Sequence, residues 1–281
     1  PLVLFYLNEY QILFYTFVTF FILGLFSDLN IFYSAKKRFL LQVLILLIFA
    51  VVSNLEITST RINFLDFLLE NIFFNYFFTI FCLVVLINGS NFIDGLNGLL
   101  LVYFLLIVFF LFKLDLLNNF SFLEEKELGL LIVLIFILVM NFFNQLFLGD
   151  SGSYSLSFLM GVILIKIYNL NQQITPYFII LLLWYPCFEN LFSIFRKIIS
   201  KIDPLKPDNG HLHYLIYIFF KNKFNLTKLK SNNISSFSIN SFNLIVFYIA
   251  SKNINHTGYQ VSIILFSITF YCLIFYILKK N

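Results

Sequence analysis

Long runs of apolar residues constrain the fold of this chain more than any other feature of its sequence. Hydrophobic residues fill 60% of its 281 positions and charged residues only 11%, whereas soluble domains carry about a quarter charged residues. A helix of about 20 apolar residues crosses the hydrocarbon core of a bilayer and satisfies its own backbone hydrogen bonds there. The runs lack the alternation of barrel strands, so the sequence predicts an all-α, polytopic membrane protein. The nine expected spans are residues 10–26, 37–54, 70–88, 98–113, 128–146, 153–168, 175–194, 237–251 and 259–278.

The first residues, PLVLFYL, resemble the end of a further apolar span. We therefore expect one N-terminal span to be missing from the sequence, which begins at Pro1. The remainder is a continuous series of apolar runs and polar connections. Residues 1–281 are accordingly interpreted as a single integral membrane domain.

The distribution of basic residues predicts which side of the membrane each loop occupies. If the nine spans alternate in direction, thirteen of the eighteen Lys and Arg residues fall on one face. Basic residues concentrate in cytoplasmic loops. This face is therefore predicted to be cytoplasmic, and residues 195–236 are predicted to be a cytoplasmic loop on it.

Four polar clusters interrupt the apolar sequence, and each follows an odd-numbered span. They are FSDLN (26–30), NGSNFIDGLNG (88–98), FLGDSGS (147–153) and KIDPLKPDNGHLHY (201–214). Odd-numbered spans all end on the same face, which is the basic one. The sequence therefore predicts a single polar site at the cytoplasmic end of the spans.

The second and third clusters carry side chains suited to a hard cation. Asn88, Asn91 and Asp94 recur every three residues, so on a helix end they lie roughly along one face. Their oxygens suit Mg²⁺, as does the carboxylate of Asp150. Ser153 opens the next span, where free helix N–H groups favour a phosphate. A glycine-rich turn with ordinary helix caps remains the alternative for both clusters.

Cationic and imidazole side chains in the other clusters suit phosphate groups. His211 and His213 stand two apart, with no further ligand nearby to complete a zinc site. Lys37 and Arg38 follow Asp28 after the first span and offer positive charge to a phosphate, although a simple membrane anchor explains them as well.

Glu189 lies inside the span 175–194, where a carboxylate is costly and needs a partner or a wet cavity. Arg196 follows seven residues later on the same helical face. The pair either braces a helix end or takes part in the site, and both possibilities remain open at this level.

Taken together and in this order, the motifs resemble those of the polyprenyl-phosphate N-acetylhexosamine-1-phosphate transferases of glycosyltransferase family 4, which include the MraY and WecA enzymes. The resemblance runs from GLFSDLNIFYSAKKRFLLQ to PLKPDNGHLHYLIY, and NFIDGLNGL, YPCFENLFSIFRK and PDNGHLHY are most similar to the bacterial branch that uses UDP-HexNAc.

The resemblance implies transfer of HexNAc-1-phosphate from a UDP-sugar to undecaprenyl or another polyprenyl phosphate, with release of UMP. It implies a multi-pass protein of the bacterial inner membrane that acts at the cytoplasmic face in cell-surface polysaccharide synthesis, such as O-antigen or lipopolysaccharide. The implied cofactor is Mg²⁺, with Mn²⁺ as an alternative. The expected partners are the UDP-sugar, polyprenyl phosphate and membrane lipid, without nucleic acid; a homodimer is left open.

Position by position, the resemblance assigns roles to the polar residues. Asp150, and next Asn91, would bind the metal, and Asp94 would lie beside the nucleotide or diphosphate. Asp28 would be a base for the lipid phosphate, although such a phosphate, with a second pKa of about 6, is already largely ionised. The residues expected to contact phosphate or substrate are His211, His213, Lys37, Arg38, Asn88, Ser153, Glu189 and Arg196.

Three positions depart from the family pattern. Ser27 stands where the family usually has the first of two acids, Asn97 where many members have Asp, and Tyr214 in place of the last histidine. Ser27 keeps an inactive relative as one alternative.

Two other classes of membrane protein fit these clusters less well. A transporter would need polar residues near the bilayer midplane, and an alcohol phosphotransferase of the CDP type would need a denser row of aspartates.

Overall fold

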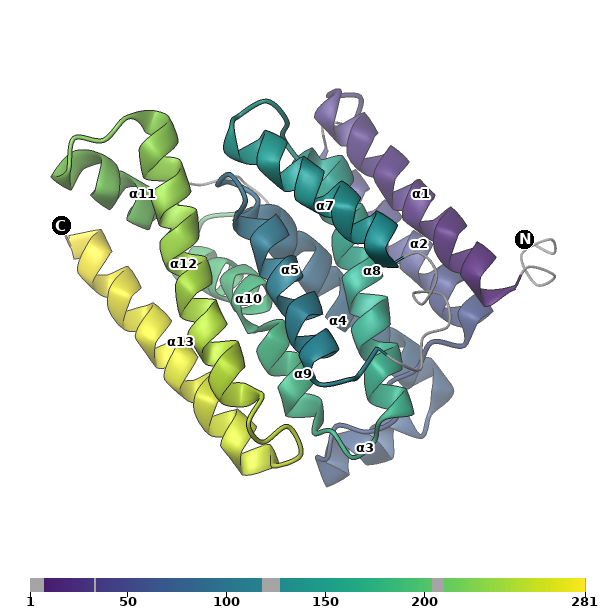
Figure 1. Cartoon of the computed structure of the whole chain (residues 1–281). Helices are drawn as coiled ribbons and strands as arrows, with labels where there is room; N and C mark the ends of the chain where they lie inside the picture. Colours follow the sequence, from purple (N-terminus) through teal and green to yellow (C-terminus); the bar gives the residue numbers. More distant parts are fainter. Residues whose placement is uncertain (1–7, 33, 118–126, 204–209, 281) are drawn as a thin grey trace.

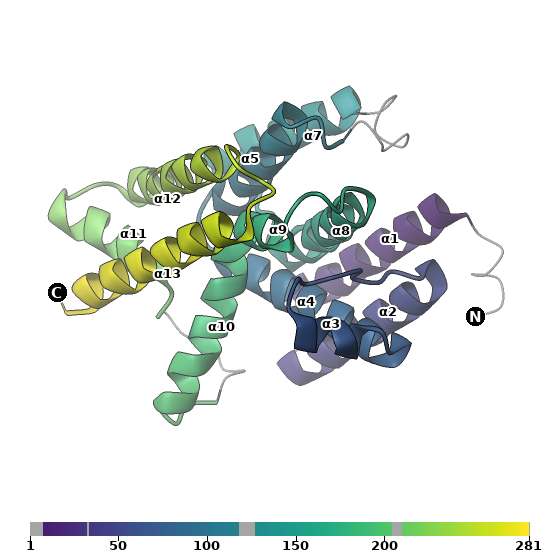
Figure 2. The ribbon, with the colours of Figure 1, turned by 90° about the horizontal axis from the view of Figure 1, so that it is seen from below.

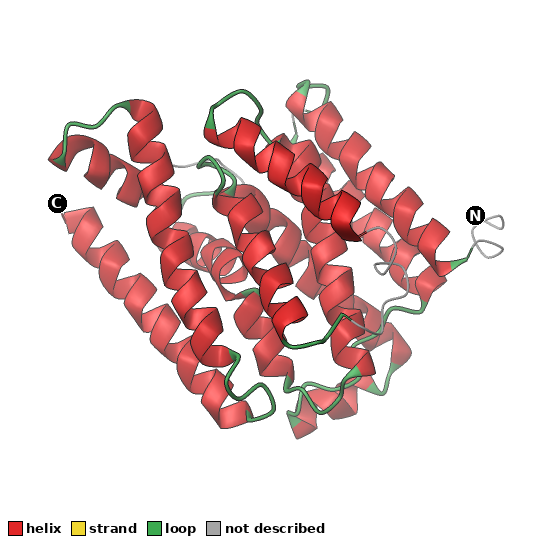
Figure 3. Cartoon of the chain, viewed as in Figure 1, coloured by secondary structure: helices red, strands yellow, loops and turns green. Residues whose placement is uncertain are grey.

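The computed structural model describes residues 8–32, 34–117, 127–203 and 210–280, and all regular structure within these ranges is helical, as predicted (Figure 3). The helices are α1 (Glu9–Asp28), α2 (Ala35–Ser53), α3 (Asn63–Leu69), α4 (Ile72–Ile93), α5 (Leu99–Lys113), α7 (Glu127–Phe142), α8 (Gly149–Leu170), α9 (Pro176–Leu182), α10 (Trp184–Ile199), α11 (Leu212–Lys223), α12 (Lys228–Ala250) and α13 (Thr257–Lys280).

Each predicted span falls on one or more of these helices, but the helices differ in their capacity to cross a membrane. Among the described residues, α1, α4, α8 and α13 are long and apolar enough, and a fifth span results if α9 and α10 are counted together. The first turn of α2 carries three cations, α5 and α7 have only 15 and 16 residues, and α12 is rich in Ser and Asn. The count of nine spans therefore stays a prediction.

The run 175–194, predicted as one helix, consists of two helices whose axes differ by 74°. Pro186 provides the physical reason. In a continuous helix its ring would meet the carbonyl group of Leu182, and it has no N–H to donate. The chain instead starts a new helix at Trp184, so Pro186 lies in a first turn, where no intrahelical N–H bond is needed.

The stretch 195–236, predicted as a loop, contains the end of α10, all of α11 and the start of α12. Its histidine motif immediately precedes and enters α11, whereas residues 204–209 lie outside the described ranges. Thr227 caps α12 by accepting a hydrogen bond from the backbone N–H of Lys230, which explains why that helix begins well before the apolar run at 237.

α8 lies at the centre of the bundle, between two groups of helices. On one side, its Phe158 packs between Phe20 of α1 and Phe49 of α2, with ring centroids 5.0 and 4.9 Å away. On the other side, residues such as Leu164 join a second apolar core with α5, α9, α10, α12 and α13. Seen from below, the two groups spread to either side of α4 and α8 (Figure 2).

One end of the bundle gathers the polar segments. The turn after α1, the end of α4 and the loop before α8 all lie along the upper edge of Figure 1, with α11 on the same side. The fold thus brings together chain segments that are far apart in the sequence.

Candidate active site

Asp150, in the first turn of α8, is the acceptor at the centre of this polar end. Arg38 forms an ion pair with it at 2.9 Å, and the amide nitrogen of Asn91 lies 2.6 Å from its Oδ1. The hydroxyl of Tyr154 donates to it at 3.1 Å, and the hydroxyl of Ser27 also donates to it. Because these donors belong to α1, α2, α4 and α8, a single carboxylate connects four helices.

Asp28, the last residue of α1, caps the N-terminus of α8. Its Oδ1 accepts the backbone N–H of Asp150 at 2.9 Å, and its Oδ2 accepts that of Ser151 at 3.1 Å. The first N–H groups of a helix lack intrahelical partners, and a carboxylate there opposes the positive end of the helix dipole. The amides predicted to meet a phosphate are thus occupied by Asp28, and its role as a base stays a prediction.

The three residues spaced along the end of α4 have different partners. Asn91 donates to Ser153 at 3.1 Å as well as to the α8 carboxylate, and Ser153 is fully buried. Asn88, one turn earlier, donates to Gln42 of α2 at 2.9 Å. Asn91 and Ser153 therefore belong to the central cluster, whereas Asn88 links α4 to α2 further from the end of the bundle.

Asp94 follows α4 and places a third carboxylate in the same region. Burial, the neighbouring Asp150 carboxylate and, more weakly, Asp28 raise the pKa of Asp94 well above its usual range, while a hydrogen bond from the backbone N–H of Gly149 acts in the opposite direction. Burial and the two neighbouring carboxylates thus act together to disfavour the charged form of Asp94.

Glu189 holds the first histidine of the motif. It is only 1% exposed. Its Oε1 lies 2.9 Å from Nδ1 of His211 and accepts the backbone N–H of Leu212 at 3.3 Å. Its Oε2 accepts the hydroxyl of Tyr271 at 2.8 Å. Glu189 therefore connects α10 to α11 and α13, and both alternatives for Glu189 and Arg196 stay predictions.

His213 connects the histidine motif to the turn after α4. Its ring stacks on His211 at 5.5 Å, and His211 lies 5.1 Å from the ring of Phe92. A Cβ added at Gly95 would come within 2.9 Å of Nε2 of His213, so only glycine leaves room for this ring. Burial lowers the pKa of His213 to about 4 despite the Glu189 carboxylate, which leaves the ring neutral at pH 7. Its buried Nδ1 has no hydrogen-bond partner among the described residues.

The remaining basic candidates differ in their position. Arg196 lies against Gly210, directly before the histidine motif, because a Cβ at Gly210 would collide with its guanidinium group. Lys37 is exposed on the first turn of α2, whereas Arg38 reaches α8. Of the two alternatives after the first span, Arg38 is the one at the central cluster.

Several members of the site were not predicted from the sequence. Tyr154 stands four residues after Asp150, one helical turn away, and that spacing could have revealed it. Ser27 departs from the family pattern, and that departure gives no sign that its hydroxyl also accepts a hydrogen bond from Arg38. Tyr271 contacts Glu189 across 82 positions, and no local pattern indicates it.

Asn97, the second departure, lies outside the carboxylate cluster. Its backbone N–H donates to Asn232 at 2.6 Å, and its amide group donates to Asn144 at 3.2 Å. It therefore joins the turn after α4 to α12 and to the loop before α8.

The donor set at this end fits a divalent cation that is completed by substrate. Within the described ranges, no three His, Cys, Asp or Glu side chains are arranged to enclose a metal. Mg²⁺ is usually held by one or two carboxylates together with waters and substrate phosphates. The carboxylates of Asp94 and Asp150 lie close together, with the carboxamide of Asn91 beside Asp150, and this donor set is consistent with such a site.

These apolar helices define a multi-pass membrane protein. Its candidate site is the polar cluster that the helices share at one end of the bundle. The chain belongs to glycosyl transferase family 4, whose family model matches residues 10–168. The matched range includes Asp28, Asn91, Asp94 and Asp150.

Individual relatives are similar over about two thirds of this chain. A probable undecaprenyl-phosphate N-acetylglucosaminyl 1-phosphate transferase of Bacillus subtilis (strain 168) is 29% identical over 191 residues, which is 66% of this chain and 52% of the relative. The undecaprenyl-phosphate alpha-N-acetylglucosaminyl 1-phosphate transferases of Thermotoga maritima and Escherichia coli O157:H7 are 28% and 24% identical, over 69% and 65% of this chain and 57% and 52% of theirs. The chain thus spans little more than half the length of these relatives. No solved structure matches it significantly.

Proposed function

We propose that this protein transfers an N-acetylhexosamine 1-phosphate from a UDP-sugar, UDP-N-acetylglucosamine or a related amino sugar, to undecaprenyl or another polyprenyl phosphate, and releases UMP. An acceptor phosphate oxygen attacks the sugar-linked phosphorus, and the bond from that phosphorus to UMP breaks. The relatives' names provide the acceptor and the sugar. The chemistry of the site supports phosphoryl transfer.

One observation carries the proposal: the four polar segments form one continuous set of contacts. Asp28 bonds to the start of α8, and Asp150 bonds to Asn91. Gly149 bonds to Asp94, whose neighbour Gly95 packs against the second histidine. Carboxylates on one side, acting through a bound cation, and histidines on the other would together hold a diphosphate.

The roles of the residues follow from their surroundings. Arg38, together with neutral His213, would face developing negative charge on the phosphates. Asp150, Asn91 and Asp94 would hold Mg²⁺ or Mn²⁺, which supplies charge neutralisation for the diphosphate when bound. Asp28 would keep the start of α8 in place, and Glu189 would hold His211 in one orientation.

An apolar groove of about 410 Å³ is proposed for the isoprenoid chain of the acceptor. It is lined by α4, α8, α9, α10 and α13, with Phe78, Cys82, Gly161, Leu191 and Ile268 among its walls. The ends of α4 and α8 carry Asn91 and Asp150. A chain lying along these helices would therefore place its phosphate beside the polar cluster.

The proposed setting is the bacterial inner membrane, with the site at the cytoplasmic face and nine spans in this chain. The concentration of basic residues on that face supports this orientation. The route is proposed to lead to a cell-surface polysaccharide, since the lipid-linked sugar remains in the membrane.

The test is release of UMP from radiolabelled UDP-sugar by purified protein with polyprenyl phosphate and Mg²⁺. Asp150→Asn should lower turnover by at least about 100-fold, because it removes the central charge of the site, while circular dichroism and size exclusion in detergent show a folded protein. Asp115→Asn, at an exposed position after α5, is the matched control. Normal turnover by Asp150→Asn would remove Asp150 from its role.

Ser27, in the place of a family acid, favours one competing possibility, an inactive relative. If the folded wild type releases no UMP with any UDP-HexNAc, that alternative replaces the transferase. Flux of a UDP-sugar into liposomes without UMP release would instead indicate a transporter.

A further inference from the structure

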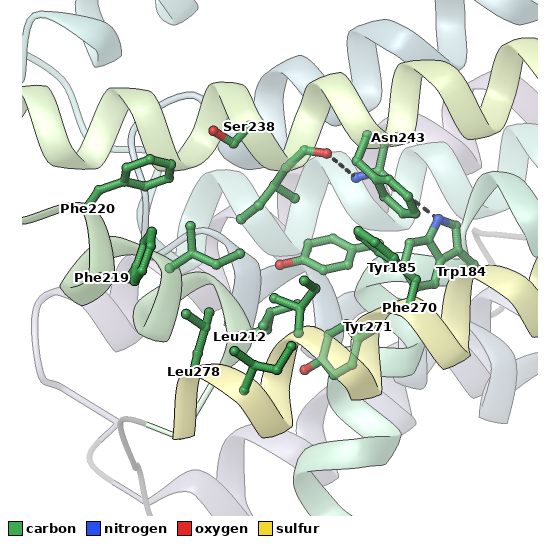
Figure 4. Close-up of a pocket in the computed structure, with 15 residues that line it drawn as sticks. Trp184, Tyr185, Leu212, Phe219, Phe220, Ser238, Asn243, Phe270, Tyr271 and Leu278 are labelled. Atoms are coloured by element: carbon green, nitrogen blue, oxygen red, sulfur yellow. Dashed lines mark hydrogen bonds between the residues drawn. The ribbon is translucent and has the colours of Figure 1, made fainter. Parts of the chain in front are cut away.

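A second apolar cavity, of about 420 Å³, lies between α10, α11, α12 and α13. Neither α4 nor α8 lines it, which distinguishes it from the groove proposed for the acceptor, although Trp184 lines both. Figure 4 shows its aromatic walls, with Phe219 and Phe220 at one end and Trp184 and Phe270 at the other. A volume of this size is within the range of ligand pockets.

The polar groups in this lining are satisfied within the protein, with one exception. Trp184 donates to Asn243 at 3.0 Å, and Tyr271 donates to Glu189. The hydroxyl of Tyr185, a residue that is 1% exposed, has no partner among the described residues, and it extends toward the middle of the lining side chains (Figure 4). A buried hydroxyl without a partner is costly, and an oxygen of a bound molecule would satisfy it.

Basic residues gather near the end of the cavity at Phe219. Residues 209–281 contain seven lysines and no Asp or Glu. Six of these lysines lie where α11 ends, α12 begins and α13 ends, and these helix ends lie close together (Figure 1). Lys223 lies over the ring of Phe219 at 4.9 Å, and Lys279 directly follows Leu278, another lining residue. The six are Lys221, Lys223, Lys228, Lys230, Lys279 and Lys280, all exposed.

We propose that this cavity binds one acyl chain of an anionic membrane phospholipid, whose headgroup lies on the lysines at the ends of α11 and α13. An apolar cavity supplies the site for the chain, and basic clusters at a membrane surface attract anionic lipids. An ester oxygen at the head of the chain is available to the Tyr185 hydroxyl. The acceptor lipid fits less well, because its phosphate must reach Asp150 on α8, which does not line this cavity.

The position of the cavity gives the bound lipid a structural consequence. Tyr271, in its wall, donates to Glu189, which in turn holds His211. An occupied cavity would fix α11 against α13 and so stabilise the histidine side of the site.

Trp184 provides the measurement, since it is the single tryptophan of the chain and lines the cavity. The protein is reconstituted in phosphatidylcholine vesicles that contain a minor, constant fraction of either dibrominated phosphatidylglycerol or dibrominated phosphatidylcholine. Bromine quenches tryptophan on contact. We expect the anionic brominated lipid to quench Trp184 several-fold more strongly than the zwitterionic one. Equal quenching by the two lipids, or none by either, would overturn the proposal.

Variants separate the headgroup contribution from general attraction to the surface. Lys223→Gln combined with Lys279→Gln should weaken apparent binding of the anionic lipid roughly 30-fold. Lys252→Gln, at the other end of α12, should leave it unchanged. A double variant that is quenched like the wild type contradicts the proposal.

Because Trp184 also lines the acceptor groove, the two cavities are distinguished by filling each in turn. Ser238→Phe, in the lipid cavity, should reduce quenching, and Ile268→Phe, in the acceptor groove, should not; the reverse result overturns the assignment. Unlabelled polyprenyl phosphate that restores the fluorescence would reassign the cavity to the acceptor. No step requires nucleotide or turnover, so this test stands apart from that of the transferase.

Discussion

Tyr271→Phe tests the connection between α13 and the histidine motif. The substitution removes one hydroxyl, which donates to Oε2 of Glu189 at 2.8 Å in a fully buried environment. Hydrogen bonds to charged groups contribute about 1.5–3 kcal/mol. We therefore expect the free energy of unfolding to fall by about 2 kcal/mol, with no cavity to add to the cost because the ring is kept.

Substitutions at Glu189 extend the same reasoning. Glu189→Ala leaves three buried donors without an acceptor, at about 1–3 kcal/mol each, a total comparable to the whole stability of many domains. Glu189→Gln is the informative variant, because its oxygen can still accept from His211 and Leu212 while the charge is lost. Its cost should lie between those of Tyr271→Phe and Glu189→Ala.

The assay is reversible unfolding in mixed micelles, followed by circular dichroism. Tyr276→Phe is the matched control, since Tyr276 lies on the same helix and is 69% exposed, and its substitution should change stability by less than about 0.5 kcal/mol. If Tyr271→Phe and Tyr276→Phe are indistinguishable, the buried carboxylate does not hold α13, and the reasoning is refuted.

Three further predictions concern the polar end. The pKa of His213 is lowered to about 4 in the folded protein, so the neutral ring contributes its full stability above the unfolded pKa of about 6.5. That contribution is lost as pH falls from about 6.5 toward 4, and the loss in the free energy of unfolding should reach about 3 kcal/mol. The loss should disappear in His213→Asn, and a variant with the same pH profile as the wild type would contradict the prediction. Gly149→Ala should lower the free energy of unfolding by about 1–3 kcal/mol, because the residue has φ +66° and a Cβ would lie 2.7 Å from Oδ2 of Asp28. Gly258→Ala, where a Cβ would make only ordinary contacts, is the control. Equal stability of the two variants would argue against the cap that Asp28 provides for α8. Removal of divalent cations with EDTA should stop UMP release and added Mg²⁺ should restore it, whereas turnover in EDTA would exclude the proposed metal role.

The sequence predicted which polar segments lie at one end of the bundle, whereas their roles in a site stay predictions. Asp28, Asn91, Asp150 and His211 each follow an odd-numbered span, and this alone predicts that they share one end of the bundle. The contacts of the structure bring their segments together. The sequence did not identify which side chains pair. Ser27 and Asp150, for example, are 123 positions apart in the chain, and their contact depends on how α1 and α8 are rotated against each other.

The sequence by itself determined that the protein is an all-helical membrane protein. The apolar character and the length of a run are properties of each segment alone, so composition and run length were sufficient for this prediction. Tertiary packing decided the rest. It selected Arg38 over Lys37 as the partner of Asp150 and turned Asp28 into the cap of another helix. It also enclosed Glu189 among three donors. Such choices depend on the rotation and crossing of whole helices, which no single segment encodes.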